Sequence, residues 1–469
     1  MLSKIKYYAL EITVYFLVLL RLLIIGFVPL FDKTEARYAE IARIMYETGN
    51  WVTPQIDYNV PFWAKPPMST WISALSFHVF GVHEFAARFP SFLLQVILII
   101  IVAKALNFKK RQTYWFALIM LTIPEYYIHC GVVSTDSSLL MGITFIMIGF
   151  WNSISKANNQ KFWKFLIWLG VAIGMLAKGP IVLVLTAPPI FIWSCLYKGH
   201  LKLFFKKTLW IPGIAFAFLF SFLWYYSAEL RTPGFIDYFF VGEHYKRFVE
   251  SGWKGDKYGF AKQQPLGMIW LFLILFAIPW FQFIVVNGFK MKKEILKNKW
   301  VTFLWIWMLW TPLFFTISKS LIHTYTLPSM IPLGLLVMCY FESYHKNKRW
   351  VVGAMFVPIL VFICFISINT FYTDVSWQNT DKHLVGKINP LETTNIYAWE
   401  FKSYSSQFYT SGQIKTLHNS EELENILKEE KTFYILSRNA NYKHMPEALK
   451  KHLFKIGANR KSQLFIHKP

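Results

Sequence analysis

The stretch SLLMGITFIMIGFWNSIS, residues 138–155, contains no charged side chain. As a helix, it is long enough to cross the hydrocarbon core of a lipid bilayer, which is roughly 30 Å thick. Similar apolar runs recur along the 469-residue chain, and many are flanked by tryptophan and tyrosine, which favour the membrane–water interface. The sequence therefore predicts an all-α protein that crosses a membrane several times.

About eleven membrane helices are predicted along the chain. Their expected ranges are 8–30, 88–106, 112–129, 138–155, 163–178, 181–197, 208–227, 264–288, 300–317, 325–343 and 350–370. Short loops rich in lysine and arginine face the cytoplasm in most membrane proteins. With a cytoplasmic N-terminus, all five such loops fall on that side. They are Lys104–Arg111, Lys156–Lys164, Lys198–Lys207, Lys290–Lys299 and Lys346–Arg349.

The net charge of +23 is therefore assigned to membrane topology and to contact with anionic lipid. Nucleic acid is not expected as a partner. We predict two parts, a membrane module at residues 1–370 and a small α/β domain at residues 371–469 on the outer side.

The outer side also receives a long loop, residues 31–87. There we expect two amphipathic helices at the membrane surface, one over Ala36–Tyr46 and one ending at Phe80. Thr34 is the expected cap of the first helix, and Gly49 follows its end. In the tail, strands are predicted at 394–397, 413–417, 432–436 and 463–467, and helices at 421–429 and 446–454.

Two charged residues sit at the outer ends of apolar runs. Lys178, in GMLAKGP (residues 174–180), opposes the positive-inside trend. Its side chain either reaches out to the interface or binds an anion, and the Gly-Pro that follows leaves backbone N–H groups free for a phosphate. Asp136 is either a helix cap or a functional carboxylate.

Two further segments carry candidate site residues. In GEHYKRF (residues 242–248), Glu243, His244 and Arg247 lie within one helical turn, either as an ion pair or as a ligand-binding group. Lys65 precedes a rigid Pro-Pro turn and is either an exposed loop lysine or part of the site.

The predicted topology puts these residues on one face of the membrane. The set is Asp32, Glu35, Arg37, Lys65, Asp136, Lys178, Arg247 and Tyr325. Carboxylates can remove a proton from a nucleophile, and cations can stabilise a phosphate leaving group on a lipid. The clustering favours group transfer from a lipid phosphate.

Several ordered motifs also resemble a known family. TEARYAEIA (34–42), GNWVTP (49–54), FWAKPP (62–67), FGVHEFAARFP (80–90), LAKGP (176–180), EHYKRF (243–248) and YTLP (325–328) are similar to motifs of the lipid A aminoarabinose transferases. These proteins belong, with the protein O-mannosyltransferases, to the C-type glycosyltransferase (GT-C) superfamily. The resemblance covers about residues 25–335.

The resemblance implies an inverting glycosyltransferase of the bacterial inner membrane. It would move a sugar from a polyprenyl-phosphate carrier to a lipid, glycan or protein acceptor on the outer face, as a monomer. By this resemblance, Lys65, Lys178, Arg247 and Tyr325 would hold the donor phosphate. The catalytic carboxylate would be Glu35, Asp32 or Asp136, with Arg37, Glu243 and His244 nearby.

Two positions depart from the family pattern. The family usually carries two adjacent acidic residues before Ala-Arg-Tyr. In this sequence the first of these positions is Thr34, so the identity of the base stays open between Glu35, Asp32 and Asp136. The family places a glutamate that takes part in metal binding directly before Lys-Pro-Pro. In this sequence that position is Ala64. No cofactor is therefore predicted, and His244 is the residue left as a ligand for a divalent metal.

Two other functions fit a polytopic protein with outer charges. A flippase or transporter of lipid-linked sugars would need polar residues through the whole membrane depth, and a non-catalytic envelope component would tolerate loss of the charges. Under the enzyme hypothesis, Lys178→Ala or Glu35→Gln should abolish transfer and leave folding intact.

Overall fold

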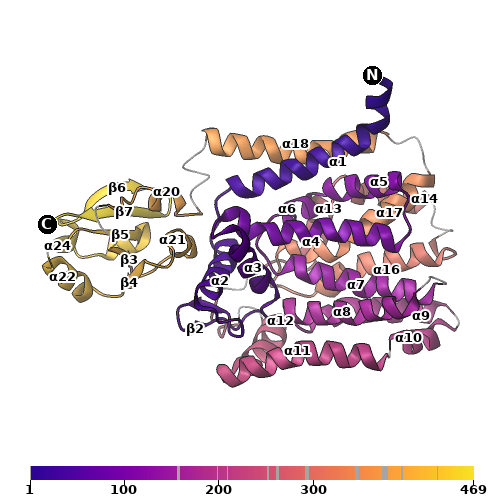
Figure 1. Cartoon of the computed structure of the whole chain (residues 1–469), viewed down its shortest axis with the longest axis horizontal. Coiled ribbons are helices and arrows are strands. Elements are labelled where there is room, and N and C mark those ends of the chain that lie inside the picture. The colour runs from indigo at the N-terminus through magenta and orange to yellow at the C-terminus, as the bar shows by residue number, and fades with distance from the viewer. Residues whose placement is uncertain are drawn as a thin grey trace.

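The structure is a computed structural model. It describes residues 2–155, 159–197, 199–208, 210–250, 253–259, 263–290, 295–343, 348–371, 379–391, 395–429 and 431–469. The long helices run side by side in a bundle, and a small sheet lies at one end of it, next to α2 (Figure 1). The predicted fold class, a helical membrane protein with a small C-terminal α/β unit, is confirmed.

The helices of the bundle follow the chain in order. They are α1 (Leu2–Phe27), α4 (Glu84–Ala105), α5 (Lys110–Leu121), α6 (Pro124–His129), α7 (Asp136–Ile154), α8 (Gln160–Lys178), α9 (Ile181–Leu196), α10 (His200–Thr208), α11 (Ile211–Arg231), η1 (Asp237–Lys246), α12 (Arg247–Val249), α13 (Met268–Phe276), α14 (Trp280–Lys290), α16 (Lys299–Phe315), η2 (His323–Ser329), α17 (Met330–Ser343) and α18 (Lys348–Phe371).

Two predicted spans are broken helices, so the prediction of a continuous helix was wrong for both. The span at 112–129 divides into α5 and α6 because Pro124 has no N–H to donate and keeps Ile123 extended. The span at 264–288 divides into α13 and α14, which meet at a bend of 100° beside Pro279. Within the described ranges, six helices are long and apolar enough to cross a membrane, or seven if that bent pair is one span. The count of eleven therefore stays a prediction.

Glycines determine how α7 and α8 pack. A Cβ added at Gly142 would lie 2.7 Å from the carbonyl oxygen of Gly170, and one at Gly170 would lie 2.6 Å from that of Gly142. Only residues without a side chain let two helix backbones approach this closely. The two helices pack antiparallel, so Asp136 at the start of α7 meets Lys178 at the end of α8.

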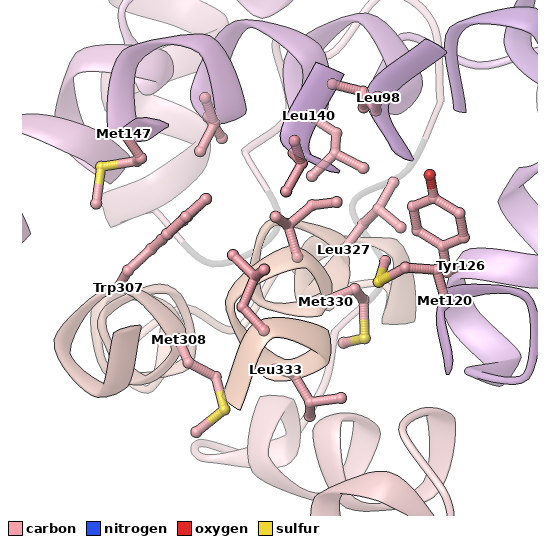
Figure 2. Close-up of a cluster of buried hydrophobic side chains, with 14 of the residues drawn as sticks. Leu98, Met120, Tyr126, Leu140, Met147, Trp307, Met308, Leu327, Met330 and Leu333 are labelled. Carbon is pink, nitrogen blue, oxygen red and sulfur yellow. The ribbon is translucent and has the colours of Figure 1, made fainter. Parts of the chain in front are cut away.

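A continuous apolar core holds the bundle together. Figure 2 shows side chains from α4, α5, α6, α7, α16, η2 and α17 interlocked in it, and the labelled ones are Leu98, Met120, Tyr126, Leu140, Met147, Trp307, Met308, Leu327, Met330 and Leu333. The core thus extends to η2, which carries Tyr325, and holds that segment against α7.

The predicted outer loop, residues 31–87, is more deeply buried than predicted. α2 (Thr34–Thr48) ends at Gly49 in a left-handed conformation, as predicted, but Lys33 rather than Thr34 takes the cap position. Ten of its fifteen residues are buried, because α3 (Met68–Phe80) and the C-terminal unit cover it. A short hairpin of β1 (Gln55–Asp57) and β2 (Val60–Pro61) follows α2. α2 is therefore a core element and not an amphipathic surface helix.

The C-terminal unit contains a five-stranded sheet in the order β4-β3-β5-β7-β6. Its elements are α20 (Lys382–Val385), β3 (Ile396–Trp399), α21 (Tyr404–Tyr409), β4 (Lys415–Leu417), α22 (Ser420–Lys428), β5 (Phe433–Arg438), α23 (Asn439–His444), α24 (Glu447–Lys450), β6 (Phe454–Ala458) and β7 (Ser462–His467). β4, β3 and β5 are parallel, whereas β7 is antiparallel to both β5 and β6.

The prediction of a helix at 446–454 was wrong for the second half of that range. The helical part ends at Lys450, and Phe454 begins β6, which pairs with β7. Strand pairing across the sheet overrides the local helical pattern here. The start of the strand predicted at 394–397 lies outside the described residues. Residues 372–378, beside the predicted domain boundary at 370/371, also lie outside them, so that boundary stays a prediction.

Polar contacts join α21 to the segment from Asp32 to Glu84. Ser405 donates hydrogen bonds to the Asp32 carboxylate from both its N–H and its hydroxyl. The Tyr409 hydroxyl lies 2.9 Å from a carboxylate oxygen of Glu84, and Gln407 donates to Asp57. These contacts place the C-terminal unit over α2.

Candidate functional site

A cavity of about 380 Å³ opens between the ends of α7, α8 and α9 and the segments η1, α12 and η2. Its lining includes the imidazole of His244 and five charged side chains, Lys65, Asp136, Lys178, Glu243 and Arg247. The rest of the wall is mainly apolar and includes Leu139, Ile181, Val184, Leu185, Phe248, Phe314, Phe315 and Pro328. Residues distant in the sequence thus build one pocket that is lined by both charged and apolar side chains.

Lys178 and Asp136 form an ion pair in this cavity. The Lys178 Nζ lies 2.6 Å from Asp136 Oδ1, and their side chains are only 13% and 11% exposed. The ammonium also lies 5.1 Å from the ring centre of Tyr325, within cation–π range. The pair is held at the point where the glycine-mediated packing of α7 and α8 brings the two helix ends together.

A second charged group faces the first. Glu243 accepts hydrogen bonds from Lys65 at 2.8 Å and from Arg247 at 2.9 Å. Burial acts to raise the pKa of the Glu243 carboxyl, but the charges of Lys65 and Arg247 outweigh it and hold that pKa at about 2. The carboxylate is therefore ionised at neutral pH, and it orients two cations whose side chains stay 21% and 28% exposed.

The charge balance of the lining residues is positive. Three cationic side chains, Lys65, Lys178 and Arg247, face two carboxylates, Asp136 and Glu243. Each cation is held by a carboxylate and still borders the cavity. A third carboxylate, Asp256, lies 3.9 Å from the Arg247 guanidinium outside the cavity lining. An anion that enters the cavity finds three positioned cationic donors, which is the arrangement that binds phosphate groups.

Gly179 allows the two halves of the site to approach. It adopts φ +74°, and an added Cβ would lie 2.8 Å from the Phe239 ring and 3.2 Å from His244 Nε2. Glycine is therefore required both by the turn after α8 and by the contact with η1. His244 in turn lies 3.0 Å from the carbonyl oxygen of Lys178, which ties η1 to the end of α8.

The residues present do not fit the metal that the family resemblance implies. Both ring nitrogens of His244 face backbone carbonyl oxygens, of Phe239 at 2.8 Å and of Lys178 at 3.0 Å. A metal would have to displace one of these contacts, and the partner position is the buried, apolar Ala64. We assign no step of the chemistry to a metal at His244.

Three predicted site residues do not line the cavity. Glu35 forms a two-pronged ion pair with the buried Arg88, with N–O distances of 2.7 and 2.8 Å. Asp32 faces Ser405 of the C-terminal unit. Arg37 donates to the carbonyl oxygen of Tyr258 and lies over the rings of Tyr38 and Phe62. The structure thus separates these residues from Asp136, the one predicted carboxylate base in the cavity.

Other lining residues had no distinctive signal in the sequence. Ser318, Ser320 and Thr324 border the cavity, and they come from the loop and turn that precede Tyr325. Arg88, the partner of Glu35, lies within a quoted motif, but its partner could not be deduced without the fold. Small hydroxyl residues and buried arginines are common, so spacing alone does not mark them.

Comparisons with known proteins extend this description. The model of the family described as dolichyl-phosphate-mannose-protein mannosyltransferase matches residues 7–239. The undecaprenyl phosphate-alpha-4-amino-4-deoxy-L-arabinose arabinosyl transferase 2 of Pseudomonas fluorescens (strain Pf0-1) is 29% identical over 342 residues, which are 71% of this chain and 59% of that protein. The transferase of the same description from Wigglesworthia glossinidia brevipalpis is 30% identical over 360 residues, 74% of this chain and 61% of that protein.

The fold also has a solved counterpart. The crystal structure of ArnT from Cupriavidus metallidurans bound to undecaprenyl phosphate matches with a TM-score of 0.77 over 98% of both chains, at 16% identity. The fold is thus that of a multi-pass membrane protein with the architecture of this crystal structure. The resemblance predicted from the motifs is confirmed: the chain is a relative of the aminoarabinose transferases and of the protein O-mannosyltransferases. The chain spans about three fifths of the length of the curated relatives it matches.

The contact between Asp32 and Ser405 leads to a prediction about pH. Burial raises the pKa of the Asp32 carboxyl from 3.8 to about 6, although the hydrogen bonds from Ser405 oppose this. The folded protein therefore holds the proton more tightly than the unfolded chain. The resulting stabilisation is complete below pH 3.8 and is lost as the pH rises through about 6.

Asp32→Asn removes this titration. We expect its melting temperature, relative to wild type, to rise as the pH is raised from about 4 to about 7 and to stay level above that. Ser405→Ala removes one donor to the carboxylate and should shift the window to higher pH. Thermal unfolding of the purified protein across this range is the measurement. A difference between Asp32→Asn and wild type that does not change with pH would contradict the assignment.

Proposed function

We propose that this protein is an inverting glycosyltransferase. It transfers a sugar from a polyprenyl-phosphate carrier to an acceptor on the outer face of the bacterial inner membrane. The observation that carries the proposal is the cavity in which Lys65, Lys178 and Arg247, each held by a carboxylate, stand beside an apolar wall. The relatives named for undecaprenyl-phosphate sugars support the donor class.

The cationic residues of the cavity are the proposed binding site for the donor phosphate. A sugar-linked polyprenyl phosphate is a diester with one negative charge, and the released polyprenyl phosphate carries more. Lys65, Lys178 and Arg247, with the Tyr325 hydroxyl, would therefore bind the departing phosphate more strongly than the donor phosphate. Interactions that strengthen as charge develops lower the barrier to transfer.

The apolar wall suits the lipid chain. Leu139, Val184, Leu185, Phe248 and Phe314 line the same cavity as the charged residues, so one molecule with a phosphate head and a hydrocarbon tail can contact both kinds of side chain. Burial of such a tail against apolar side chains stabilises the complex by roughly 25 cal/mol per Å².

Asp136 is the carboxylate we assign to the reacting centre, because of the three predicted bases it is the one that lines the cavity. Its oxygen would take the proton of the acceptor hydroxyl. The acceptor oxygen then bonds to the anomeric carbon as the bond from that carbon to the phosphate oxygen breaks, and the phosphate leaves with the electron pair. One displacement inverts the anomeric configuration.

The decisive experiment is a transfer assay with the full chain in detergent or liposomes. Undecaprenyl-phosphate-linked pentoses, hexoses and amino sugars are supplied singly with lipid, glycan and protein acceptors. We expect labelled sugar on one class of acceptor, with the anomeric configuration opposite to that of the donor. Movement of intact donor across the bilayer without product would instead establish a flippase and overturn the proposal.

A further inference from the structure

Three side chains that can bind a metal ion meet outside the cavity lining, between α6 and η2. Glu125 and His129 are one helical turn apart on α6, and His323 begins η2. Glu125 Oε1 lies 3.1 Å from His129 Nε2, and Glu125 Oε2 lies 3.0 Å from His323 Nδ1. One ligand atom from each residue lies within 4.8 Å of the other two.

The burial of this group is unusual. Glu125 is fully buried, and His129 is only 3% exposed. The Nδ1 atom of His129 has no hydrogen-bond partner, and its Nε2 atom has only the ion-pair contact with Glu125. Buried polar atoms are nearly always satisfied, and an exception calls for a missing partner such as an ion. The incomplete hydrogen bonding of the buried His129 ring is therefore consistent with a bound ion at this cluster.

The distances fit a tetrahedral metal ion. Ligand atoms that bind Zn²⁺ at about 2.0–2.1 Å lie about 3.3 Å from one another in a tetrahedron. Glu125 is already near this distance from both imidazoles. The gap between the two histidines needs to close by no more than about 1.5 Å. The His323 side chain, which is 38% exposed and stacks on Phe276, is the ligand that would have to move.

We propose that Glu125, His129 and His323 form a binding site for a divalent transition-metal ion, with Zn²⁺ as the best match. Two imidazoles and one carboxylate are a common zinc ligand set that leaves a fourth position for water. The His323 side chain is 38% exposed, so this position has access to solvent. The site shares no residue with the donor-phosphate cavity or with His244.

An ion here would join α6 to η2. Thr324 and Tyr325, the next two residues of η2, line the cavity. Binding of the ion would therefore restrain the segment that presents Tyr325 to the donor phosphate. This is a positioning role, because none of the three ligands lines the cavity.

The test uses the full-length protein, stripped with a chelator and titrated with Zn²⁺ by calorimetry, with metal content measured by mass spectrometry. Wild type should bind one ion, and His323→Ala should weaken binding at least about 10-fold. His323 is chosen because it is half-exposed, whereas loss of Glu125 or His129 would disturb the core. His418→Ala, at an exposed histidine of the C-terminal unit, is the matched control and should bind like wild type.

Two further measurements make the result decisive. Co²⁺ should give the visible absorption of a tetrahedral ion in wild type and in His418→Ala, but not in His323→Ala. Zn²⁺ should raise the melting temperature of the same two proteins and leave that of His323→Ala unchanged. Absence of Zn²⁺ binding by the wild type, equal binding by His323→Ala, or loss of binding in His244→Ala with retention in His323→Ala would each overturn the proposal.

Discussion

Lys178→Ala is expected to reduce sugar transfer at least about 100-fold, since it removes a buried cation from the place where we propose that the leaving phosphate binds. It should also destabilise the protein. Asp136 would remain buried without its partner, and breaking a buried ion pair in this way costs about 3–5 kcal/mol. Transfer rates and thermal unfolding, measured on the same preparation, give both effects.

A double variant separates the two effects. In Lys178→Met/Asp136→Asn, neither charge is left unpaired, so we expect most of the stability to return. Transfer should stay lost, and binding of undecaprenyl phosphate should stay weak. Arg231→Ala, at an exposed cation on the end of α11, is the control and should keep wild-type transfer. Transfer restored by the double variant would remove Lys178 from the donor site.

Glu35→Gln should act mainly on folding. The Glu35 carboxylate pairs with Arg88, whose guanidinium is buried and also donates to the carbonyl oxygens of Ile25, Val28 and Pro29. Glutamine removes the countercharge, and we expect a loss of about 3–5 kcal/mol in the free energy of unfolding. Denaturant or thermal unfolding in detergent measures this loss.

Glu47→Gln is the matched control on the same helix. Glu47 also pairs with an arginine, Arg43, but its side chain is 49% exposed, so the expected loss is within about 1 kcal/mol. The sequence pattern alone predicts a different result for Glu35→Gln, namely loss of transfer with intact folding. A variant of wild-type stability that transfers no sugar would therefore restore Glu35 as the candidate base and count against Asp136.

The candidate site shows how far reasoning from sequence reaches. Charge placement and motif order put Lys65, Lys178, Arg247 and Tyr325 on one side of a membrane, and the structure brings these four into one cavity. The same reasoning grouped Glu35 and Asp32 with them. A carboxylate looks alike in sequence whether it faces a cavity, a buried arginine or another domain, and its partner decides between these.

Proline positions explain the differences in the fold. Pro124 and Pro279 lie inside apolar runs, and hydropathy averages over them although the helix breaks or bends there. The same break at Pro124 creates α6 and so places Glu125 and His129 against His323. In the tail, β6 forms because β7 offers a partner strand, which no local pattern reveals.

By itself, the sequence determined that the protein is a helical membrane protein with a small C-terminal α/β unit, because runs of apolar residues must be buried in lipid or protein wherever they lie. Its motifs also indicated the GT-C type. Only the tertiary structure decided which charges meet. The close packing of α7 and α8 at their glycines brings Asp136 to Lys178. Glu35 instead pairs with Arg88 and does not line the cavity. Such pairings depend on distances of a few ångströms between segments far apart in the chain, and burial makes their electrostatic consequences large.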